Sequence, residues 1–562
     1  MVAAALVALL ALAVQPARSQ PATTPRGPVA RVRLPFPQDD GSLTPYTFEL
    51  GYPLMTLVYD TLLWRGADGV PQPWLARSVD TSADGRTLTI RLADGARWHD
   101  GPPVTSADVA FTFAWVAAHP HPRFTDEVAA VERVAAPDPA TAVVTLRRSQ
   151  PGFADQPLAD LPILPKHLWE HLAPGKAAPD GLAVGSGPYR LAEHVPGQRY
   201  RFEAVPGYFL GPPAVATIEV PIMGGVDDTV HALERGDVDM VPVNLPDTLK
   251  KRLDTLSVKV AEGASYAGTV LLFNLRSAPF DRPEVRRAVA GSVDLGRIAR
   301  AEGGAVAADH GYLHPESPFS SPDVLHAIDR ATARPVLRSL TAPVIVLAPD
   351  NDPAKVEAGR LVAQAVIGAG GAAEVKAVPK ADYERAIGEN GGAPSFQAAI
   401  WTTPPLASYD PAILGRLFGS GPASAALNLA GYHSDAFDEL ARRVATTADP
   451  ASRKAATREA LGLLAADDPV LPLYFAGGAF AYRPAVYDGW VFVKGSGILD
   501  KRSFAGPRPV ATTTTRPTTP TAVVDGAAGK GGGLPAGTLA VAGLAGAVLL
   551  AAVAVVIGRR QG

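Results

Sequence analysis

The chain has 562 residues, of which 47% are hydrophobic and 19% charged, and this composition excludes a chain that is disordered throughout. At roughly 100–200 residues per domain, the length predicts three or four domains. The 52 Lys and Arg residues nearly balance the 55 Asp and Glu residues, which argues against a nucleic-acid partner, and the lack of cysteine excludes disulfides, zinc–thiolate sites, thiol catalysis and cysteine lipidation.

The N-terminal region carries a short apolar segment at residues 2–14. This segment is too short to span a bilayer. The small residues Ala17 and Ser19 follow it, and signal peptidase prefers small residues at its cleavage site. We therefore predict a signal peptide at residues 1–19, with a buried N-terminal helix as the alternative.

Strands and helices are interleaved in the body of the chain. Residues 86–92 alternate strictly between aliphatic and polar side chains, which predicts a half-buried strand. Residues 143–147 and 470–475 predict two further short strands. No fixed-period repeat is present in the sequence. The mixture predicts an α/β protein, but the pattern does not order the strands.

Several helices are marked by capping residues. Thr105 and Asp108 have the spacing of a capping box, and the sequence beginning at Asp281 repeats this device. Ser434 is the expected N-cap of another helix. Asp449 precedes a proline, which is favourable at the first position of a helix because its missing N–H is not needed there.

Enzyme signatures are absent from the sequence. It contains no G-x-S-x-G, H-E-x-x-H, G-x-x-x-x-G-K-[ST] or G-x-G-x-x-G motif. His119 and His121 lie close together, but proline-flanked histidines without a carboxylate at helical spacing favour an exposed loop over a metal site. We therefore predict no catalytic residue, no metal site and no cofactor.

The C-terminal region predicts a membrane anchor. Residues 534–557 carry no charge, and at ~1.5 Å per residue they would reach across the ~30 Å hydrocarbon core. Arg559 and Arg560 follow, which predicts a cytoplasmic tail at 558–562. Residues 506–533 are rich in Thr, Pro and Gly and predict a flexible linker. The body would then lie at the cell surface, outside the cytoplasm; a cleaved tail is the alternative.

A series of ordered motifs resembles one known family. The motifs are LVYDTLL at 57–63, DGRTLTIRL at 84–92, WHDGPPVTSADV at 98–109, GSGPY at 185–189, and PEVRRA at 283–288. Together they resemble the bacterial extracellular solute-binding proteins of family 5, which are peptide- and nickel-binding receptors of ABC importers. The resemblance covers about residues 29–504.

The resemblance implies a two-lobed periplasmic-binding-protein-like fold of type II, cluster C, which encloses a solute between its lobes. The expected first lobe comprises 28–52, 184–262 and 468–505, with an extra domain at 53–183 packed on it. The expected second lobe comprises 263–467. Strands crossing between the lobes would form the hinge, and closure on the ligand would be the mechanism.

Peptide-binding members of the family carry an acid shortly after a tryptophan of the second lobe. Here Trp401 is followed by Thr402 and Thr403, and the first acid is Asp410, for which a cap or turn before Pro411 is the alternative role. The amine-anchoring acid of the family is therefore missing at this place. We predict six cleft residues, with core packing as the alternative for the aromatic ones: Phe48, Glu49, Tyr266, Trp401, Tyr409 and Asp410.

Two functions of different classes are compatible with the sequence. The first is a monomeric, non-enzymatic receptor that captures a peptide or peptide-like solute and delivers it to the permease subunits of an ABC importer. The second is a membrane-tethered ligand sensor or adhesion module on the same fold, without transport. Nickel chelates and sugars remain alternative ligands, because all of these solutes use this scaffold in the family.

Overall fold

The computed structural model describes residues 29–505, except 49, 122, 173–177, 244–246, 322, 325, 326, 390, 391, 404, 422, 423, 425 and 426. The expected signal peptide at 1–19, linker at 506–533, transmembrane helix at 534–557 and tail at 558–562 lie outside the described residues. Within the described ranges, no helix combines the length and the apolar character needed to cross a bilayer.

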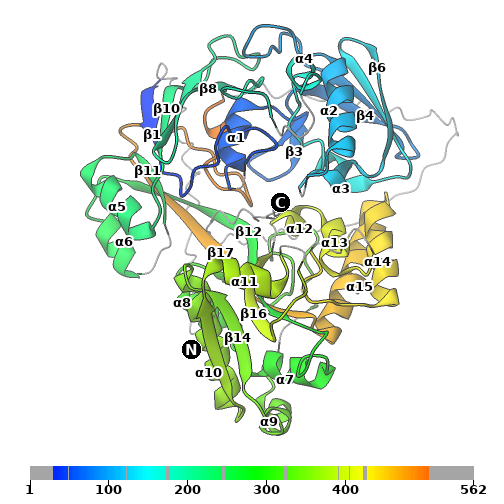
Figure 1. Ribbon diagram of the computed structural model, residues 1–562, viewed down its shortest axis with the longest axis vertical. Coiled ribbons are helices and arrows are strands. Elements are labelled where there is room, and N and C mark those ends of the chain that lie inside the picture. Colours follow the sequence, from blue (N-terminus) through cyan, green and yellow to red (C-terminus); the bar gives the residue numbers. More distant parts are fainter. Residues whose placement is uncertain are drawn as a thin grey trace, which may run out of the picture.

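Two four-stranded sheets form the upper half of the molecule (Figure 1). In the first sheet β1 runs parallel to β10, and the remaining neighbours are antiparallel; the order is β1 (Val29–Arg33), β10 (Val215–Pro221), β9 (Arg199–Ala204) and β8 (Tyr189–Val195). The second sheet is antiparallel throughout, in the order β4 (Ala76–Thr81), β5 (Thr87–Leu92), β7 (Thr141–Leu146) and β6 (Val131–Asp138).

Short elements complete this half. A hairpin joins β2 (Leu63–Arg65) to β3 (Pro71–Pro73). The helices are α1 (Tyr52–Val58), α2 (Ser106–Ala118), α3 (Thr125–Val128), η1 (Pro151–Ala154), α4 (Lys166–Trp169), α5 (Val226–Arg235), α6 (Asp247–Leu253) and η4 (Lys501–Ser503). The predicted strand at 86–92 is confirmed as β5, whose alternate residues are buried. The predicted capping box is also confirmed, with Thr105 as the N-cap of α2 and Asp108 bonding back to its backbone.

A seven-stranded sheet continues from the upper half into the lower half (Figure 1). Its order is β11 (Met240–Val243), β17 (Val470–Tyr482), β12 (Lys259–Phe273), β16 (Ala398–Thr403), β14 (Val344–Pro349) and β15 (Ala373–Val378), with β13 (Val306–Ala307) paired to β17. The strand predicted at 470–475 is confirmed but is longer, because β17 continues alongside β12 into the upper half. The two long strands therefore belong to both halves.

The lower half is a three-layer lobe around β14, β15 and β16. One face of this part of the sheet packs on α7 (Pro283–Ser292), α8 (Leu295–Ala301), α9 (Arg330–Arg338) and α10 (Pro353–Gly368). The other face packs on α11 (Lys380–Ile387), α13 (Leu414–Phe418), α14 (Asp435–Thr446) and α15 (Pro450–Asp467), with the short α12 (Leu406–Tyr409) and η2 (Pro411–Ile413) between them. The predicted two-lobed α/β fold is confirmed; the exact lobe boundaries stay a prediction.

The helix starts show where capping signals succeed and where one fails. Ser434 and Asp449 cap α14 and α15 through bonds to Phe437 N and Ser452 N, as predicted. The predicted capping box at Asp281 is wrong, because α7 has Arg282 as its N-cap and no side-chain cap bond. A residue before proline is disfavoured in helical geometry, so Pro283 sets the helix start one residue too late for Asp281 to cap it.

A buried ion pair stabilises the upper half of the molecule. Asp60 and Lys501 have fully buried side chains, and their charged atoms are 3.0 Å apart. Asp60 also accepts hydrogen bonds from Trp74 Nε1 at 2.7 Å and the Tyr208 hydroxyl at 3.0 Å. The Lys501 ammonium lies 4.2 Å from the centre of the Trp64 ring. Burial lowers the pKa of Lys501, and the charge of Asp60 opposes this shift.

We expect Lys501→Met to lower the free energy of unfolding by about 3–5 kcal/mol, because it leaves the Asp60 carboxylate buried without its cation. The double variant Asp60→Asn/Lys501→Met should recover most of this loss, since it removes both charges together. Urea denaturation of the three proteins measures the difference. A single variant as stable as the unchanged protein would contradict this assignment.

Candidate functional site

Two of the predicted residues meet where the lobes touch. The pairing of β12 with β17 is interrupted between Ala264 and Gly268, and Tyr266 lies inside this irregularity. A break of this kind re-aims a side chain that a regular ladder would hold against its neighbours. The ring of Tyr266 lies 4.9 Å from the ring of Tyr409, at the end of α12. Both residues come from the second-lobe side of the contact.

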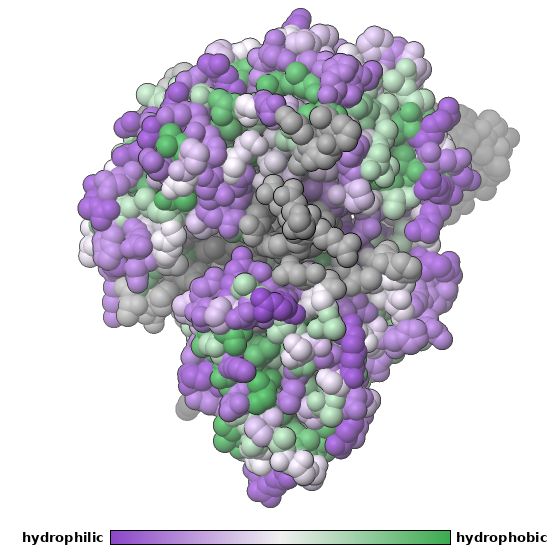
Figure 2. All heavy atoms as spheres, in the orientation of Figure 1, coloured by the Kyte–Doolittle hydropathy of each residue, from purple (hydrophilic) through white to green (hydrophobic). Residues whose placement is uncertain are grey.

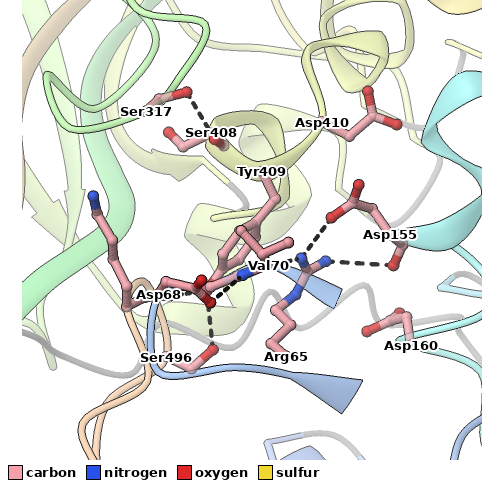
Figure 3. A network of polar contacts seen from close by, with 12 residues as sticks. Arg65, Asp68, Val70, Asp155, Asp160, Ser317, Ser408, Tyr409, Asp410 and Ser496 are labelled. Atoms are coloured by element: carbon pink, nitrogen blue, oxygen red, sulfur yellow. Dashed lines mark hydrogen bonds and ion pairs between the residues drawn. The ribbon is translucent and has the colours of Figure 1, made fainter. Parts of the chain in front are cut away.

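Tyr409 is held by groups of the first lobe. Its hydroxyl donates to the Lys494 carbonyl at 2.6 Å and lies 3.1 Å from Ser496 Oγ. The guanidinium of Arg65 lies 3.8 Å from the centre of the Tyr409 ring, a cation–π contact. Figure 3 shows Tyr409 reaching toward Arg65 and Ser496. One side chain of the lower half therefore contacts two separate segments of the upper half.

Arg65 is held in place by groups of the upper half. It ends β2, and its Nη1 atom lies 2.7 Å from Asp155 Oδ1 and 3.1 Å from the carbonyl of Gly69. The side chain of Arg65 is only 9% exposed. Because its hydrogen bonds are made within the first lobe, the flat face of the guanidinium stays available for the tyrosine.

The loop at 493–497 forms the other wall of the contact. The amide of Gly495 donates to the Ala264 carbonyl at 2.8 Å, and Lys494 N donates to the Ala67 carbonyl at 3.0 Å. Gly495 has a φ of +86°, and a Cβ there would clash with the Tyr409 hydroxyl. Glycine is therefore required twice at this position, for its backbone angle and for the close approach of the tyrosine.

Charged and titratable groups border the tyrosine pair. Lys494 Nζ lies 2.9 Å from Glu316 Oε2, so an ion pair joins the two lobes. The ring of His314 lies 5.2 Å from that of Tyr266. Burial lowers the pKa of His314 to about 4, and the nearby Lys494 adds to this effect while Glu316 opposes it. His314 is therefore neutral near pH 7.

A second contact between the halves lies beside α3. Arg416 of α13 forms an ion pair of 3.0 Å with Asp126 of α3. Gly152 of η1 approaches the Asp410 carboxylate so closely that a Cβ there would overlap it. The lobes therefore meet both at the tyrosine pair and beside the extra sheet of the upper half.

Asp410 itself is used in the fold of the second lobe. Its carboxylate accepts a hydrogen bond from Ala412 N at 3.0 Å, which caps η2, and it forms a buried ion pair with Arg453. Figure 3 shows its carboxylate turned away from the contact of Tyr409 with Arg65. The cap before Pro411 that the sequence left as an alternative is present.

The remaining predicted residues are not joined to this group by any ring contact among the described residues. Phe48 packs against Tyr52 and Phe124, at ring distances of 5.6 and 6.2 Å, within the first half. Trp401 lies in the core of the second lobe and donates from Nε1 to Glu389 Oε1 at 2.7 Å. Glu49 lies outside the described residues. A cavity of about 440 Å³ lies away from the tyrosine pair, between α7 and α9.

Several residues of the contact were missed by sequence reasoning: Arg65, His314, Glu316, Lys494 and Ser496. The one available signal was the glycine-rich run Gly495-Ser496-Gly497, which indicates a tight turn. Nothing in that run indicates that it meets a tyrosine some 85 positions earlier in the chain.

Comparison with known proteins identifies the architecture. The family model described as bacterial extracellular solute-binding proteins, family 5 Middle, matches residues 70–420. Proteins named as ABC transporter peptide-binding proteins in several Brucella species are 29% identical over 219 residues, which is 38% of this chain and 41% of theirs. Protein XP55 of Streptomyces lividans is 33% identical over 200 residues, 34% of this chain and 36% of XP55. The matched region thus spans about two fifths of these curated relatives.

Solved structures match over most of the described chain. The ABC transporter substrate-binding protein CtaP of Listeria monocytogenes has a TM-score of 0.73 at 21% identity, covering 85% of this chain and 99% of CtaP. NikZ of Campylobacter jejuni, in complex with Ni(L-His), has a TM-score of 0.72 at 19% identity, covering 85% and 99%. AppA of Bacillus subtilis, in complex with a nonapeptide, has a TM-score of 0.70 at 17% identity, covering 81% and 95%. At these identities the likeness establishes the fold.

We expect Tyr409→Ala to shift the balance between open and closed lobes toward the open form by roughly 2 kcal/mol, because it removes a cation–π contact and two hydrogen bonds. Tyr409→Phe should give a smaller shift, since the ring stays over Arg65. The chain has no cysteine, so dye pairs at Arg133→Cys and Arg442→Cys report the lobe distance by energy transfer. Identical distance distributions in the Ala variant and the unchanged protein would contradict the role of Tyr409.

We expect the free energy of unfolding to fall between pH 6.5 and 4, partly through His314. Its pKa is about 4 in the fold, against an ordinary value of 6.5, so the unfolded chain binds the proton first as the pH drops. The loss attributable to this residue approaches roughly 3 kcal/mol below pH 4. Urea denaturation at pH 7 and pH 4 should show a smaller acid loss in His314→Gln; an equal loss would exclude this contribution.

Proposed function

Because this chain belongs to family 5 of the bacterial extracellular solute-binding proteins, we propose that it captures a small solute between its two lobes and delivers it to an ABC importer. The match covers residues 70–420, well over half of the chain. A peptide or peptide-like solute is the proposed cargo, and the importer's permease subunits are the proposed partners. The proposed action is non-enzymatic, in keeping with a family of binding proteins.

The observation that carries this proposal is the tyrosine contact between the lobes. Tyr266 and Tyr409 come from the expected second lobe, whereas Arg65 comes from the expected extra domain and the 493–497 loop from the expected first lobe. A receptor of this kind needs a closed form that is stable enough to retain a ligand but weak enough to open. A few polar and ring contacts supply a modest closing energy, to which a ligand between the lobes would add.

The ligand site is proposed to include the six residues predicted from the sequence. Tyr266 and Tyr409 have the strongest support, because they lie at the lobe contact. Asp410 has the weakest, because Arg453 and the η2 cap already occupy its carboxylate. An amine anchor for a peptide terminus is thus not supplied by Asp410, which favours peptide-like solutes whose recognition does not depend on a buried ammonium.

The proposed location is outside the cytoplasm, as the family name implies. The proposed signal peptide at 1–19 would export the chain, and the apolar segment at 534–557 would anchor it in the cytoplasmic membrane. The linker at 506–533 would then hold the receptor near its permease. The body is proposed to act as a monomer. The same linker and anchor also favour a second candidate, a tethered sensor that binds the solute without transport.

The decisive experiment is a ligand screen on the purified chain with a readout of lobe closure. We expect a peptide pool to raise the melting temperature and to shorten the distance between dyes at Arg133→Cys and Arg442→Cys. At a ligand concentration of 100 times Kd, the stabilisation should be roughly 2.7 kcal/mol. Pools of nickel–histidine chelates and of sugars serve as the competing ligand classes. The absence of any response to all three pools would contradict a solute-binding function.

The contribution of Tyr266 is tested in the same screen. We expect Tyr266→Ala to weaken binding of a responding solute by roughly tenfold, because a buried ring at the lobe contact is lost. Tyr266→Phe keeps the ring and is the matched control. Equal affinities for the Ala and Phe variants would remove Tyr266 from the site. Uptake of the responding solute by cells that lack the partner permease subunits would separate import from sensing, since only import requires them.

A further inference from the structure

A groove at the far end of the second lobe is not used by the lobe contact. It has a volume of about 380 Å³ and lies among α8, α9 and α10. Figure 1 places α9 at the lower tip of the molecule, opposite the upper half. The lining residues are Asp294, Arg297, Ile298, Arg330, Arg334, Leu361, Gln364, Ala365 and Gly368.

The polar groups of the groove are mostly cationic. Arg330 and Arg334 are one helical turn apart on α9, both are exposed, and neither has a carboxylate partner in the described part of the chain. Arg297 donates to Gln364 Oε1 at 3.1 Å rather than to an acid. The acid in the lining, Asp294, caps α8 by accepting from Arg297 N. The lining thus holds three arginines and one carboxylate, and it keeps a positive excess after the nearby Glu357, which interacts with Arg297, is counted.

Two exposed isoleucines adjoin the lining residues in the sequence. Ile328 is 47% exposed and lies two positions before Arg330, and Ile367 is 52% exposed and lies beside the lining residue Gly368. The floor of the groove includes Leu361 and Ile298, which are buried. Figure 2 shows hydrophilic residues at the lower tip with hydrophobic surface just above them. Arginines next to exposed aliphatic residues are suited to the boundary between lipid headgroups and acyl chains.

We propose that this groove, with Arg330, Arg334 and Arg297 at its rim and Ile328 and Ile367 beside it, docks on the anionic phospholipid headgroups of the membrane to which the chain is tethered. The lipid phosphate would sit among the three guanidinium groups, and the two isoleucines would enter the interface. An acidic protein segment would complement the arginines but not the isoleucines, so the lipid surface fits more of the observed features.

The inference rests on the proposed membrane anchor. The linker at 506–533 has 28 residues, and a flexible chain of that length has a mean span of about 30 Å. The described chain ends in the core of the first lobe, so the groove meets the membrane when the tethered molecule lies along its surface. Tethering raises the effective concentration of the molecule there, so a weak contact per lipid is sufficient.

The test uses the full-length chain with one dye at the tip. The chain lacks cysteine, so Ile367→Cys carries a single environment-sensitive fluorophore. The protein is incubated with vesicles of phosphatidylcholine alone or with 30% phosphatidylglycerol. We expect a blue-shifted emission on the anionic vesicles, a much smaller shift on the neutral ones, and loss of the shift at high salt because exposed charges are screened. The same dye at Val260→Cys, an exposed site elsewhere, should not respond.

The variant Arg330→Gln/Arg334→Gln should lower the fraction of membrane-inserted dye at least tenfold, because each arginine near an anionic surface contributes several-fold to binding. Arg133→Gln/Arg148→Gln changes the net charge equally at exposed sites of the upper half and should behave as the unchanged protein. Equal responses of the two double variants, or equal shifts on neutral and anionic vesicles, would overturn the proposal.

A dye response to a polyglutamate peptide without any response to anionic vesicles would also overturn it, in favour of an acidic protein partner. Solute-induced lobe closure is measured in solution and does not involve this groove. Failure of membrane docking and failure of the proposed receptor function are therefore distinguishable.

Discussion

The ion pair of Asp60 with Lys501 is the constraint on which the rest of this molecule depends. It joins residues 441 positions apart and lies within a shell of tryptophan and tyrosine side chains that completes its hydrogen bonding. Arg65 follows Asp60 by five positions, and Lys494 precedes Lys501 by seven. The same buried pair thus joins both upper-half segments that meet Tyr409 and fixes their spacing.

The second lobe supplies the complementary surface by two local departures from regular structure. The interrupted ladder between Ala264 and Gly268 presents Tyr266, and the end of α12 presents Tyr409. Asp410, next in the chain, is committed to Arg453 and to the following 3₁₀ turn, which keeps α12 in place. The ion pair of Lys494 with Glu316 between the lobes is partly exposed, whereas the pairs Asp60–Lys501 and Asp410–Arg453 within the two halves are buried. Opening therefore requires little disruption of either lobe.

Local patterns were sufficient to predict much of the fold but not the site. The alternation at 86–92 and the caps at Thr105, Ser434 and Asp449 depend on neighbours within four positions, and the structure confirms them. The expected cap at Asp281 is absent because of an equally local effect: the backbone angles of the residue before Pro283 are restricted, so the helix starts too late for Asp281 to cap it. The pairing of Tyr409 with Arg65 and Lys494 depends on an irregularity in a strand and on segments brought together by the fold, and no periodicity encodes these.

The route of the chain has a mechanical consequence. The chain enters the second lobe through β12 and leaves it through β17, and these two strands pair with each other. The last described residues return to the core of the first lobe, where Phe504 is buried and its carbonyl accepts a hydrogen bond from Ala214 N. Whatever follows residue 505 therefore leaves from the first lobe. A pull on the C-terminal side would be borne by that lobe alone, and none of it would pass through the two paired strands that lead to the other lobe.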